Sequence, residues 1–536
     1  MRLNEAGLSN RQEWTQKGYR IYDFDRSLVT AQTKAAPEWI HFGAGNIFRA
    51  FQAALAQKLI ESKDMQTGLI AAEGFDYEII EKMYRPHDNI GLAVTLKADG
   101  SIDKDVIGSI VESLTVNPEN EADYSRLKEI FSAKSLKMVS FTITEKGYSL
   151  VGPDGNYTKA VLADLAAGPE DAVSYIGKVS ALLYERFVNG AYPVAMVSMD
   201  NCSHNGDKLY NAVHAFAEGW ERTGLAKEGF LEYVENPDKV SFPWSMIDKI
   251  TPRPDASVEK ILKDDGLEEL APVITGKNTY VAPFVNAEEC QYLVIEDKFP
   301  NGKLPLDKAG VIYTEKETVD KVEKMKVCTC LNPLHTCLAV FGCLMGYELI
   351  SKEMQDPVLK RLVEIIGYEE GLPVVVNPGV LDPRKFIDEV VNIRIPNPFM
   401  PDSPQRIATD TSQKLPIRYG ETIKAYMASN TLKTEDLKRI PLVFAGWLRY
   451  LMGINDAGEK FDQSSDPMLE TLCPLVADIK FGDTDIHDKV APILSDARIF
   501  AVNLYEAGLG DTVEKYFVEM LKGPGAVSET LKKYVC

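Results

Sequence analysis

The chain has 536 residues, is 45% hydrophobic and 26% charged, and carries a formal net charge of −20. This length and composition predict a globular protein of two large domains, and such acidity argues against a nucleic-acid partner, because phosphate recognition needs a cationic surface. The polar N-terminus lacks the apolar core of a signal peptide and no run approaches 18 apolar residues, so we expect a cytoplasmic protein.

Short apolar runs alternate with longer amphipathic runs in the first half of the chain. The runs 38–47, 67–76, 136–148 and 192–207 predict buried strands, and 48–64 has apolar residues near helical spacing. This alternation predicts an α/β domain with a mainly parallel, Rossmann-type sheet that binds ligands beyond the carboxyl ends of its strands. Those ends carry Thr144, Asp200 and Asn201, and we expect Thr144 and Asp200 to contact the cofactor.

The sequence "HFGAGNIFRA" places a glycine-rich turn between the first of these strands and a helix. Gly43 permits a tight turn, and Gly45 lets the backbone approach a pyrophosphate at the helix N-terminus. The third glycine of the dinucleotide fingerprint is absent. We expect the cofactor to contact Gly43, Gly45, Asn46, Ile47, Phe48 and Arg49. A helix start without a ligand is the alternative.

An acidic residue closes the next predicted strand. Glu73 follows "LIAA" and is placed to accept hydrogen bonds from the ribose hydroxyls, with Asp76 as the alternative. Because a carboxylate at this position repels a 2′-phosphate, it favours NAD over NADP.

Apolar residues follow mainly helical spacing from about residue 310 onward, and alternating β-branched residues are scarce. This pattern predicts a mainly helical second domain. Proline, glycine and charged residues cluster in 296–310, so we expect a linker there, with domains 1–305 and 306–536.

The segment "EKMKVCTCLNPLHTCLAVFG", residues 323–342, combines cysteines with acid–base residues. Its cysteines form C-x-C-x4-H-x-C, which is not the C-x2-C pairing of common zinc sites, and we expect no metal. Cys330 and Cys337 would share one face of a regular helix, as packed core residues do. A thiol- or metal-dependent protein built on this cluster stays the alternative.

The same segment can supply a general base. Asn332 and Pro333 resemble the N-cap and first residue of a helix, which would place His335 in the first turn as a ligand for substrate hydroxyls. Glu323 and Lys326 share a helix face, and an apolar neighbourhood would lower the pKa of Lys326 toward neutrality. A surface lysine paired with Glu323 is the alternative.

Seven segments, in this order, resemble blocks of the mannitol dehydrogenase family, the polyol-specific long-chain dehydrogenases. They are "HFGAGNIFRAFQA", "FTITEKGY", "SMDNCSHNG", "FPWSMIDKITP", "CQYLVIEDKFPNG", "RIATDTSQKLP" and "WLRYLMG". The resemblance covers nearly the whole chain. It implies a metal-independent, NAD-dependent interconversion of a secondary alcohol and a ketone.

The resemblance also implies the roles of individual residues. Lys326 matches the general base, and Glu323 an acid that exchanges protons with solvent. The remaining matches are Asn201 and Asn332 at the carbonyl oxygen, His335 and Asp248 at substrate hydroxyls, and Arg406 with Lys414 at the far end of the substrate. One feature departs from the family: "KVCTCLN" puts five residues between Lys326 and Asn332 where four are usual, which in one regular helix would rotate Lys326 by about 100°.

Arg406 and Lys414 suit the carboxylate of a keto-uronate, and the resemblance favours reduction of fructuronate to mannonate with NADH. Tagaturonate reductase and mannitol 2-dehydrogenase activities are the alternatives, and a non-catalytic NAD-binding relative is a further one. The resemblance leans toward a monomer that binds a sugar acid or polyol.

Overall fold

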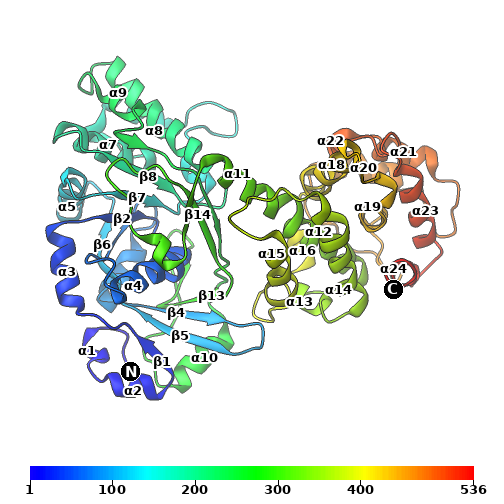
Figure 1. Ribbon diagram of the computed structural model, residues 1–536, viewed down its shortest axis with the longest axis horizontal. Helices are drawn as coiled ribbons and strands as arrows, with labels where there is room; N and C mark the ends of the chain where they lie inside the picture. Colours follow the sequence, from blue (N-terminus) through cyan, green and yellow to red (C-terminus); the bar gives the residue numbers. More distant parts are fainter. The chain divides into compact units, whose positions relative to one another are not determined.

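The computed structural model describes residues 1–536 and divides the chain into two compact units (Figure 1). The N-terminal unit comprises residues 1–96 and 101–320, and the C-terminal unit comprises residues 321–536 with the turn 97–100.

A six-stranded parallel sheet forms the centre of the N-terminal unit, with the strand order β6-β3-β2-β7-β8-β9. Its strands are β2 (Trp39–Phe42), β3 (Leu69–Glu73), β6 (Ile110–Thr115), β7 (Met138–Phe141), β8 (Val194–Ser198) and β9 (Val240–Ser241). After β2 the chain adds β3 and β6 on one side of β2. It then crosses back and adds β7, β8 and β9 on the other side. This order confirms the predicted Rossmann-type sheet and puts its topological switch point between β2 and β7.

Helices cover both faces of this sheet (Figure 1). Ile40 and Phe42 of β2 belong to one apolar core with the helices α5 (Glu121–Ser132), α7 (Tyr175–Val188) and α8 (Asn205–Arg222). Trp39 belongs to the core on the opposite face, with α4 (Ala53–Glu61). Each strand is therefore buried on both sides, which explains its continuous apolar sequence.

Two smaller sheets join segments that are distant in the sequence. One has the order β1-β5-β4-β13, from β1 (Tyr19–Ile21), β5 (Ile102–Ile107), β4 (Gly91–Leu96) and β13 (Phe284–Glu288). The other has the order β10-β14-β15, from β10 (Ser245–Asp248), β14 (Tyr292–Glu296) and β15 (Ile312–Thr314). Because β15 pairs with β14, the expected linker at 296–310 lies inside the N-terminal unit, and the division falls after residue 320 instead of 305.

The C-terminal unit is helical, as predicted. Its main helices are α12 (Asn332–Met345), α14 (Pro357–Glu364), α15 (Pro383–Glu389), α18 (Glu421–Ala428), α19 (Arg439–Leu451), α23 (Gly510–Met520) and α24 (Ala526–Val535). Preceding α12 are α11 (Lys316–Met325) and a π-helical turn, Lys326–Cys330. The helical segment Lys316–Met345 is long and apolar enough to span a membrane, but 78% of its most apolar window is buried within the protein, as in a core helix.

Candidate active site

The glycine turn lies at the switch point of the parallel sheet. Gly43 has φ 103°, and a Cβ there would stand 2.2 Å from the carbonyl oxygen of Thr142 beside it. A Cβ on Gly45 would meet no atom within 4 Å. The fold therefore requires glycine at 43, whereas Gly45 leaves open space at the start of a helix, where N–H groups lack intrahelical acceptors. This is the cradle that a dinucleotide pyrophosphate needs.

The helix after this turn opens with a π-helical turn, Phe48–Gln52, at the position of the missing third glycine. Phe48 is buried and stacks on His41 with ring centroids 4.3 Å apart. The guanidinium of Arg49 is also buried and donates to the carbonyl oxygens of Ala282 (2.8 Å) and Pro283 (2.7 Å). Both side chains, expected at the cofactor, thus support the turn from within the fold.

Glu73 is fully engaged by backbone donors. Its carboxylate accepts from the N–H groups of Ala44 (2.9 Å), Phe75 (2.7 Å) and Asp76 (3.0 Å). The carboxylate of Asp76 accepts from the hydroxyl of Thr275 (2.6 Å), and both acids are buried. The sequence placed both acids at the correct strand end, but their carboxylates connect the glycine turn to the loop after β3.

Asp200 fixes the loop that follows β7. Its carboxylate accepts from the N–H groups of Ile143 (2.9 Å) and Thr144 (2.9 Å) and from the hydroxyl of Tyr148 (2.5 Å). Burial raises the pKa of Asp200, and these hydrogen bonds oppose that shift. Thr144 has φ 66°, a strained conformation for a residue other than glycine. Asp200 therefore holds Thr144 in place at the switch point.

Asn205, which the sequence analysis missed, connects two predicted site segments. Its amide donates to the carbonyl oxygens of Asp200 (3.0 Å) and Ser245 (3.0 Å), and its side-chain oxygen accepts from the N–H of Ser245 (3.0 Å). Asn201, which is exposed, lies on the loop after β8, and Asp248, which is buried, ends β10. Asn205 thus sets the loop of Asn201 against the strand of Asp248.

In the C-terminal unit, Lys326 begins the π-helical turn. The carbonyl oxygen of Lys326 accepts from the N–H of Leu331 (3.1 Å), five residues later, which is the hydrogen bond of a π-helix. This wider turn takes up the extra residue between Lys326 and Asn332 before α12 begins. Lys326 is buried whereas Lys324 is exposed, which favours Lys326 as the functional lysine.

The expected helix start is present, since α12 begins at Asn332, but Asn332 is its first residue and not its N-cap. The cap position of α12 is Leu331, no side chain makes a capping hydrogen bond, and Pro333 lies in the first turn. The π-helical turn already supplies backbone acceptors, so the half-buried amide of Asn332 is not used as a cap. Glu323 is half-buried on α11, three residues before Lys326.

His335 lies within a group of charged side chains. Burial lowers its pKa to about 4, the charge of Asp402 raises it, and the charges of Arg418, Arg394 and Arg406 lower it further. His335 is therefore neutral near pH 7, with one ring nitrogen able to donate and the other able to accept.

Arg418 is a second residue that the sequence analysis missed. Its guanidinium donates to the hydroxyl of Thr336 (2.6 Å) and approaches the carbonyl oxygen of Asn332 (3.5 Å). The only sequence signal is a basic residue four positions after Lys414. We call Arg394, Arg406, Lys414 and Arg418 the cationic cluster.

Arg406 and Lys414, the two members of the cationic cluster that the sequence predicted, already interact with other groups of the protein. Arg406 is exposed and pairs with Asp402 one helical turn earlier. Lys414 donates to the carbonyl oxygens of Ile407 (3.1 Å) and Thr409, and burial together with the charge of Arg418 lowers its pKa. These carbonyls and Asp402 orient the cations around His335.

Cys330 and Cys337 of this segment are buried packing residues. Burial raises the pKa of the Cys330 thiol to about 12 and that of Cys337 well above its usual value. The structure contains no group of three or more His, Cys, Asp or Glu side chains that could hold a metal ion.

Comparisons with known proteins match both units. The family model of the mannitol dehydrogenase Rossmann domain matches residues 37–308, and that of the mannitol dehydrogenase C-terminal domain matches residues 318–520. The D-mannonate oxidoreductase of Thermotoga maritima is 51% identical over 100% of this chain and 99% of its own length. A mannitol 2-dehydrogenase of Pyrenophora tritici-repentis is 29% identical over 96% of this chain and 86% of its own.

The chain is also similar to a solved structure over its whole length. The mannitol 2-dehydrogenase of Pseudomonas fluorescens, in a ternary complex with NAD and D-mannitol, has a TM-score of 0.66 and 25% identity, with 99% of each chain covered. The similarity thus extends over the glycine turn as well as the helices of Lys326 and the cationic cluster.

Proposed function

The chain belongs to the mannitol dehydrogenase family, and we propose that it reduces D-fructuronate to D-mannonate with NADH and catalyses the reverse oxidation. It is an oxidoreductase of secondary alcohols. The greater identity to a D-mannonate oxidoreductase, 51% against 29% for a mannitol 2-dehydrogenase, supports a sugar acid over a polyol. The place of this reaction is hexuronate metabolism.

The cationic cluster is the structural feature that most supports a sugar acid as the substrate. The charges of three arginines lower the pKa of His335 and the charge of Asp402 raises it, so more cations than anions act on this imidazole. A carboxylate is the substrate group that such guanidinium groups bind best, through charge-assisted and often bidentate hydrogen bonds.

The catalytic roles follow the chemistry of each side chain. Bound NADH supplies the hydride that reduces the carbonyl carbon. In the proposed reaction Lys326 gives its proton to the carbonyl oxygen, and it takes the proton back during oxidation. The amides of Asn201 and Asn332 donate to that oxygen as negative charge develops. His335 and Asp248 orient substrate hydroxyls, and Glu323 returns protons to Lys326 from solvent.

The glycine turn fits the pyrophosphate of a nicotinamide dinucleotide, because the space over Gly45 is open. NAD is the dinucleotide we propose, since Glu73 closes β3 and the structural relative from Pseudomonas fluorescens contains NAD. We further propose a cytoplasmic, monomeric enzyme whose partner is a small sugar acid.

A substrate comparison tests this function. Purified protein is mixed with NADH and fructuronate, tagaturonate or fructose, and the loss of NADH absorbance is followed. We expect fructuronate to give the largest kcat/KM. Turnover with fructose alone would remove the uronate assignment.

Lys326→Ala tests the proposed acid, with Lys324→Ala as the matched control. Losing the general acid should lower kcat by about 100-fold or more and leave the Kd of NADH nearly unchanged, whereas the control should keep full activity. If Lys326→Ala remained active, the proton donor would have to be another group.

A further inference from the structure

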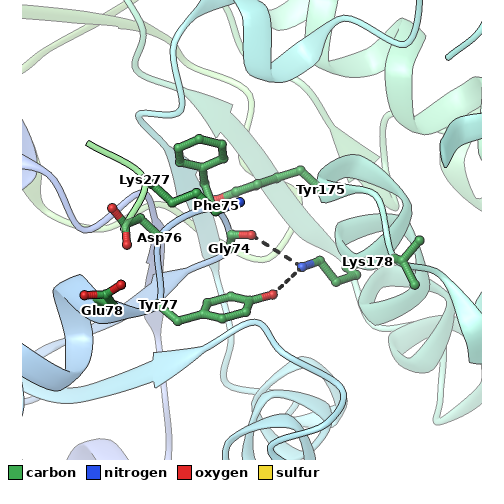
Figure 2. A pocket seen from close by; sticks show the side chains of 9 residues that line it. Gly74, Phe75, Asp76, Tyr77, Glu78, Tyr175, Lys178 and Lys277 are labelled. Carbon is green, nitrogen blue, oxygen red and sulfur yellow. Dashed lines mark hydrogen bonds between the residues drawn. The ribbon is translucent and has the colours of Figure 1, made fainter. Parts of the chain in front are cut away.

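A pocket of about 420 Å³ at the carboxyl end of β3 continues the proposed cofactor site (Figure 2). It is lined by residues 74–78, by the first residues of α7 and by Lys277. In Rossmann-type sheets a dinucleotide places its ribose beside this strand end. A separate group of side chains follows β8 and β9, at the other end of the same sheet, and the proposed reaction has not yet used it.

Trp244 is the centre of this second group. Its indole is only 8% exposed, stacks on the imidazole of His204 with ring centroids 4.1 Å apart, and donates from Nε1–H to the carboxylate of Asp207 (2.8 Å). The ammonium of Lys316 lies 4.1 Å from the centroid of the Trp244 ring and donates to the same oxygen of Asp207 (3.2 Å). Nε2 of His204 lies 3.4 Å from the carboxylate of Asp320. We call His204, Asp207, Trp244, Lys316 and Asp320 the Trp244 cluster.

The Trp244 cluster joins three segments that carry residues of the proposed reaction. His204 and Asp207 follow the loop of Asn201, and Trp244 directly precedes β10, the strand that ends at Asp248. The other two members lie on α11, the helix that carries Glu323 and is followed by Lys326. All five members belong to the N-terminal unit. The first turn of α11 is therefore attached to the N-terminal unit before the chain passes to the C-terminal unit.

The backbone around Trp244 is closely packed. A Cβ on Gly206, at the start of α8, would stand 2.5 Å from the carbonyl oxygen of Phe242 and 2.7 Å from Cδ1 of Trp244. The N–H of Trp244 donates to the carboxylate of Glu296 on β14 (3.1 Å). Because these contacts fix its backbone, the indole of Trp244 is a rigid support for the ammonium of Lys316.

The first turn of α11 acts on Lys326 through the length of the helix. Lys316 begins α11, and Lys326 comes ten residues later, about 15 Å along a helix axis. A tilt of about 10° at the first turn would displace Lys326 by roughly 2–3 Å. Proton transfer requires hydrogen-bond reach, and a misplacement of about 1 Å can lower a rate about 100-fold. Small movements at Lys316 would therefore have large effects at the proton donor.

We propose that Trp244 and Lys316 are positioning residues of the proposed reduction, which hold the first turn of α11 against the segments of Asn201 and Asp248 and so set where Lys326 meets the carbonyl oxygen. The proposal rests on the function proposed above and deepens it. Neither residue needs to touch the substrate for this role. The indole face attracts the ammonium and its N–H holds Asp207, so both contacts of Lys316 depend on Trp244.

Lys316→Met is the first test, because Lys316 is partly exposed and its replacement should leave the fold intact. We expect kcat with fructuronate and NADH to fall about tenfold, while the KM for fructuronate and the Kd of NADH stay within about threefold and the melting temperature is unchanged. Lys316→Arg keeps a cation over the indole and a donor for Asp207, so it should retain activity. Lys321→Met, at an exposed position on the same helix, is the matched control and should keep full activity.

Trp244→Leu removes the ring and its N–H together and should lower kcat at least as much as Lys316→Met. The double variant should lose no more than Trp244→Leu alone, because the two residues act through one contact. A single turnover followed by NADH absorbance should show the same loss in the rate of hydride transfer. If Trp244→Leu folds poorly, Lys316→Met and Lys316→Arg still decide the result.

The outcomes separate this role from the proposed function. Full kcat in folded Lys316→Met would overturn the positioning role and leave the function intact. A lower melting temperature with unchanged kcat would show that the Trp244 cluster only stabilises the fold, and a raised KM with unchanged kcat would show a substrate contact; either would contradict the proposal. Intact protein that turns over neither fructuronate, tagaturonate nor fructose would overturn the proposed function and this role with it.

Discussion

Gly43 and Gly45 stand two residues apart but meet different surroundings. Gly43→Ala combines φ 103° with a contact of 2.2 Å to the carbonyl oxygen of Thr142, so we expect a lower melting temperature and little soluble protein. Gly45→Ala places its methyl group in open space, so the fold should be unchanged and the Kd of NADH should rise roughly tenfold. Thermal melting and NADH titration of the two variants measure this difference. Unchanged NADH affinity in Gly45→Ala would exclude close approach of the cofactor.

Arg418 lets the substrate assignment be tested on one side chain. Arg418→Met removes a guanidinium beside His335, so we expect the KM for fructuronate to rise roughly tenfold and the weaker activity on fructose to change little. Lys424→Met, on the exposed face of α18, is the charge-matched control and should change neither KM. Equal losses on both substrates would show that Arg418 supports α12 through Thr336 instead of binding a carboxylate.

Local sequence predicted which residues stand at the ends of strands and in the helix of Lys326, but not what their side chains contact. Glu73 and Arg49 illustrate the limit. The carboxylate of Glu73 is occupied by the N–H of Ala44, and the guanidinium of Arg49 by the carbonyl oxygens of Ala282 and Pro283, more than 200 residues away. Arg418 was missed because its significance comes from its proximity to α12, which no spacing in the sequence reveals.

The π-helical turn Lys326–Cys330 takes up an extra residue between α11 and α12. Its hydrogen bond spans five residues, from the N–H of Leu331 to the carbonyl oxygen of Lys326, and α12 begins after Leu331. Deleting the half-buried Val327 should convert this turn to α-helix and retain fructuronate reduction within about tenfold. Inserting an alanine after Val327 should rotate Lys326 by about 100° and abolish turnover. Kinetics and circular dichroism of both variants check this, and a deletion that folds but loses all activity would contradict it.

The elements of the parallel sheet were predictable because each strand is a continuous apolar run buried on both faces. The strands β2, β3, β7 and β8 all lie within the predicted ranges. The sheet β1-β5-β4-β13 was not predicted, since its strand pairs join Tyr19–Ile21 to Lys104–Val106 and Phe284–Glu288 to Leu92–Leu96. Pairing between segments so far apart in the sequence leaves no local pattern that would predict it. The domain boundary was misplaced for the same reason, because only the pairing of β14 with β15 assigns 296–310 to the N-terminal unit.

At the scale of the whole molecule, the net charge is negative, whereas the charge around His335 is positive. The chain carries 79 acidic against 59 basic residues. Even so, the charges of the cationic cluster act on His335. A negative net charge disfavours binding to nucleic acids, whereas an anionic small molecule can be bound where nearby cations outnumber anions. The net charge of the chain is therefore compatible with the proposed anionic substrate.

The buried carboxyl group of Glu353 makes the stability of the molecule depend on pH. It ends α13 (Ile350–Glu353) fully buried, both carboxylate oxygens lack partners, and the carboxyl group lies against Gly342 of α12. Burial raises its pKa from 4.5 to about 9. The folded chain therefore holds a proton that the unfolded chain releases above its lower pKa. The contribution of Glu353 to the free energy of unfolding falls as pH rises from 4.5 toward 9, by roughly 3 kcal/mol on reaching pH 7.

Glu353→Met replaces the carboxyl group with an apolar side chain of similar size, so this pH-dependent loss should disappear. The variant and the intact protein should unfold at similar denaturant concentrations near about pH 5, and the variant should become increasingly more stable toward about pH 8. Glu348→Gln, at an exposed position nearby, is the control and should follow the intact protein at every pH. A constant difference between Glu353→Met and the intact protein across this range would mean that Glu353 ionises in the folded state, because only a proton retained on folding makes the difference grow with pH.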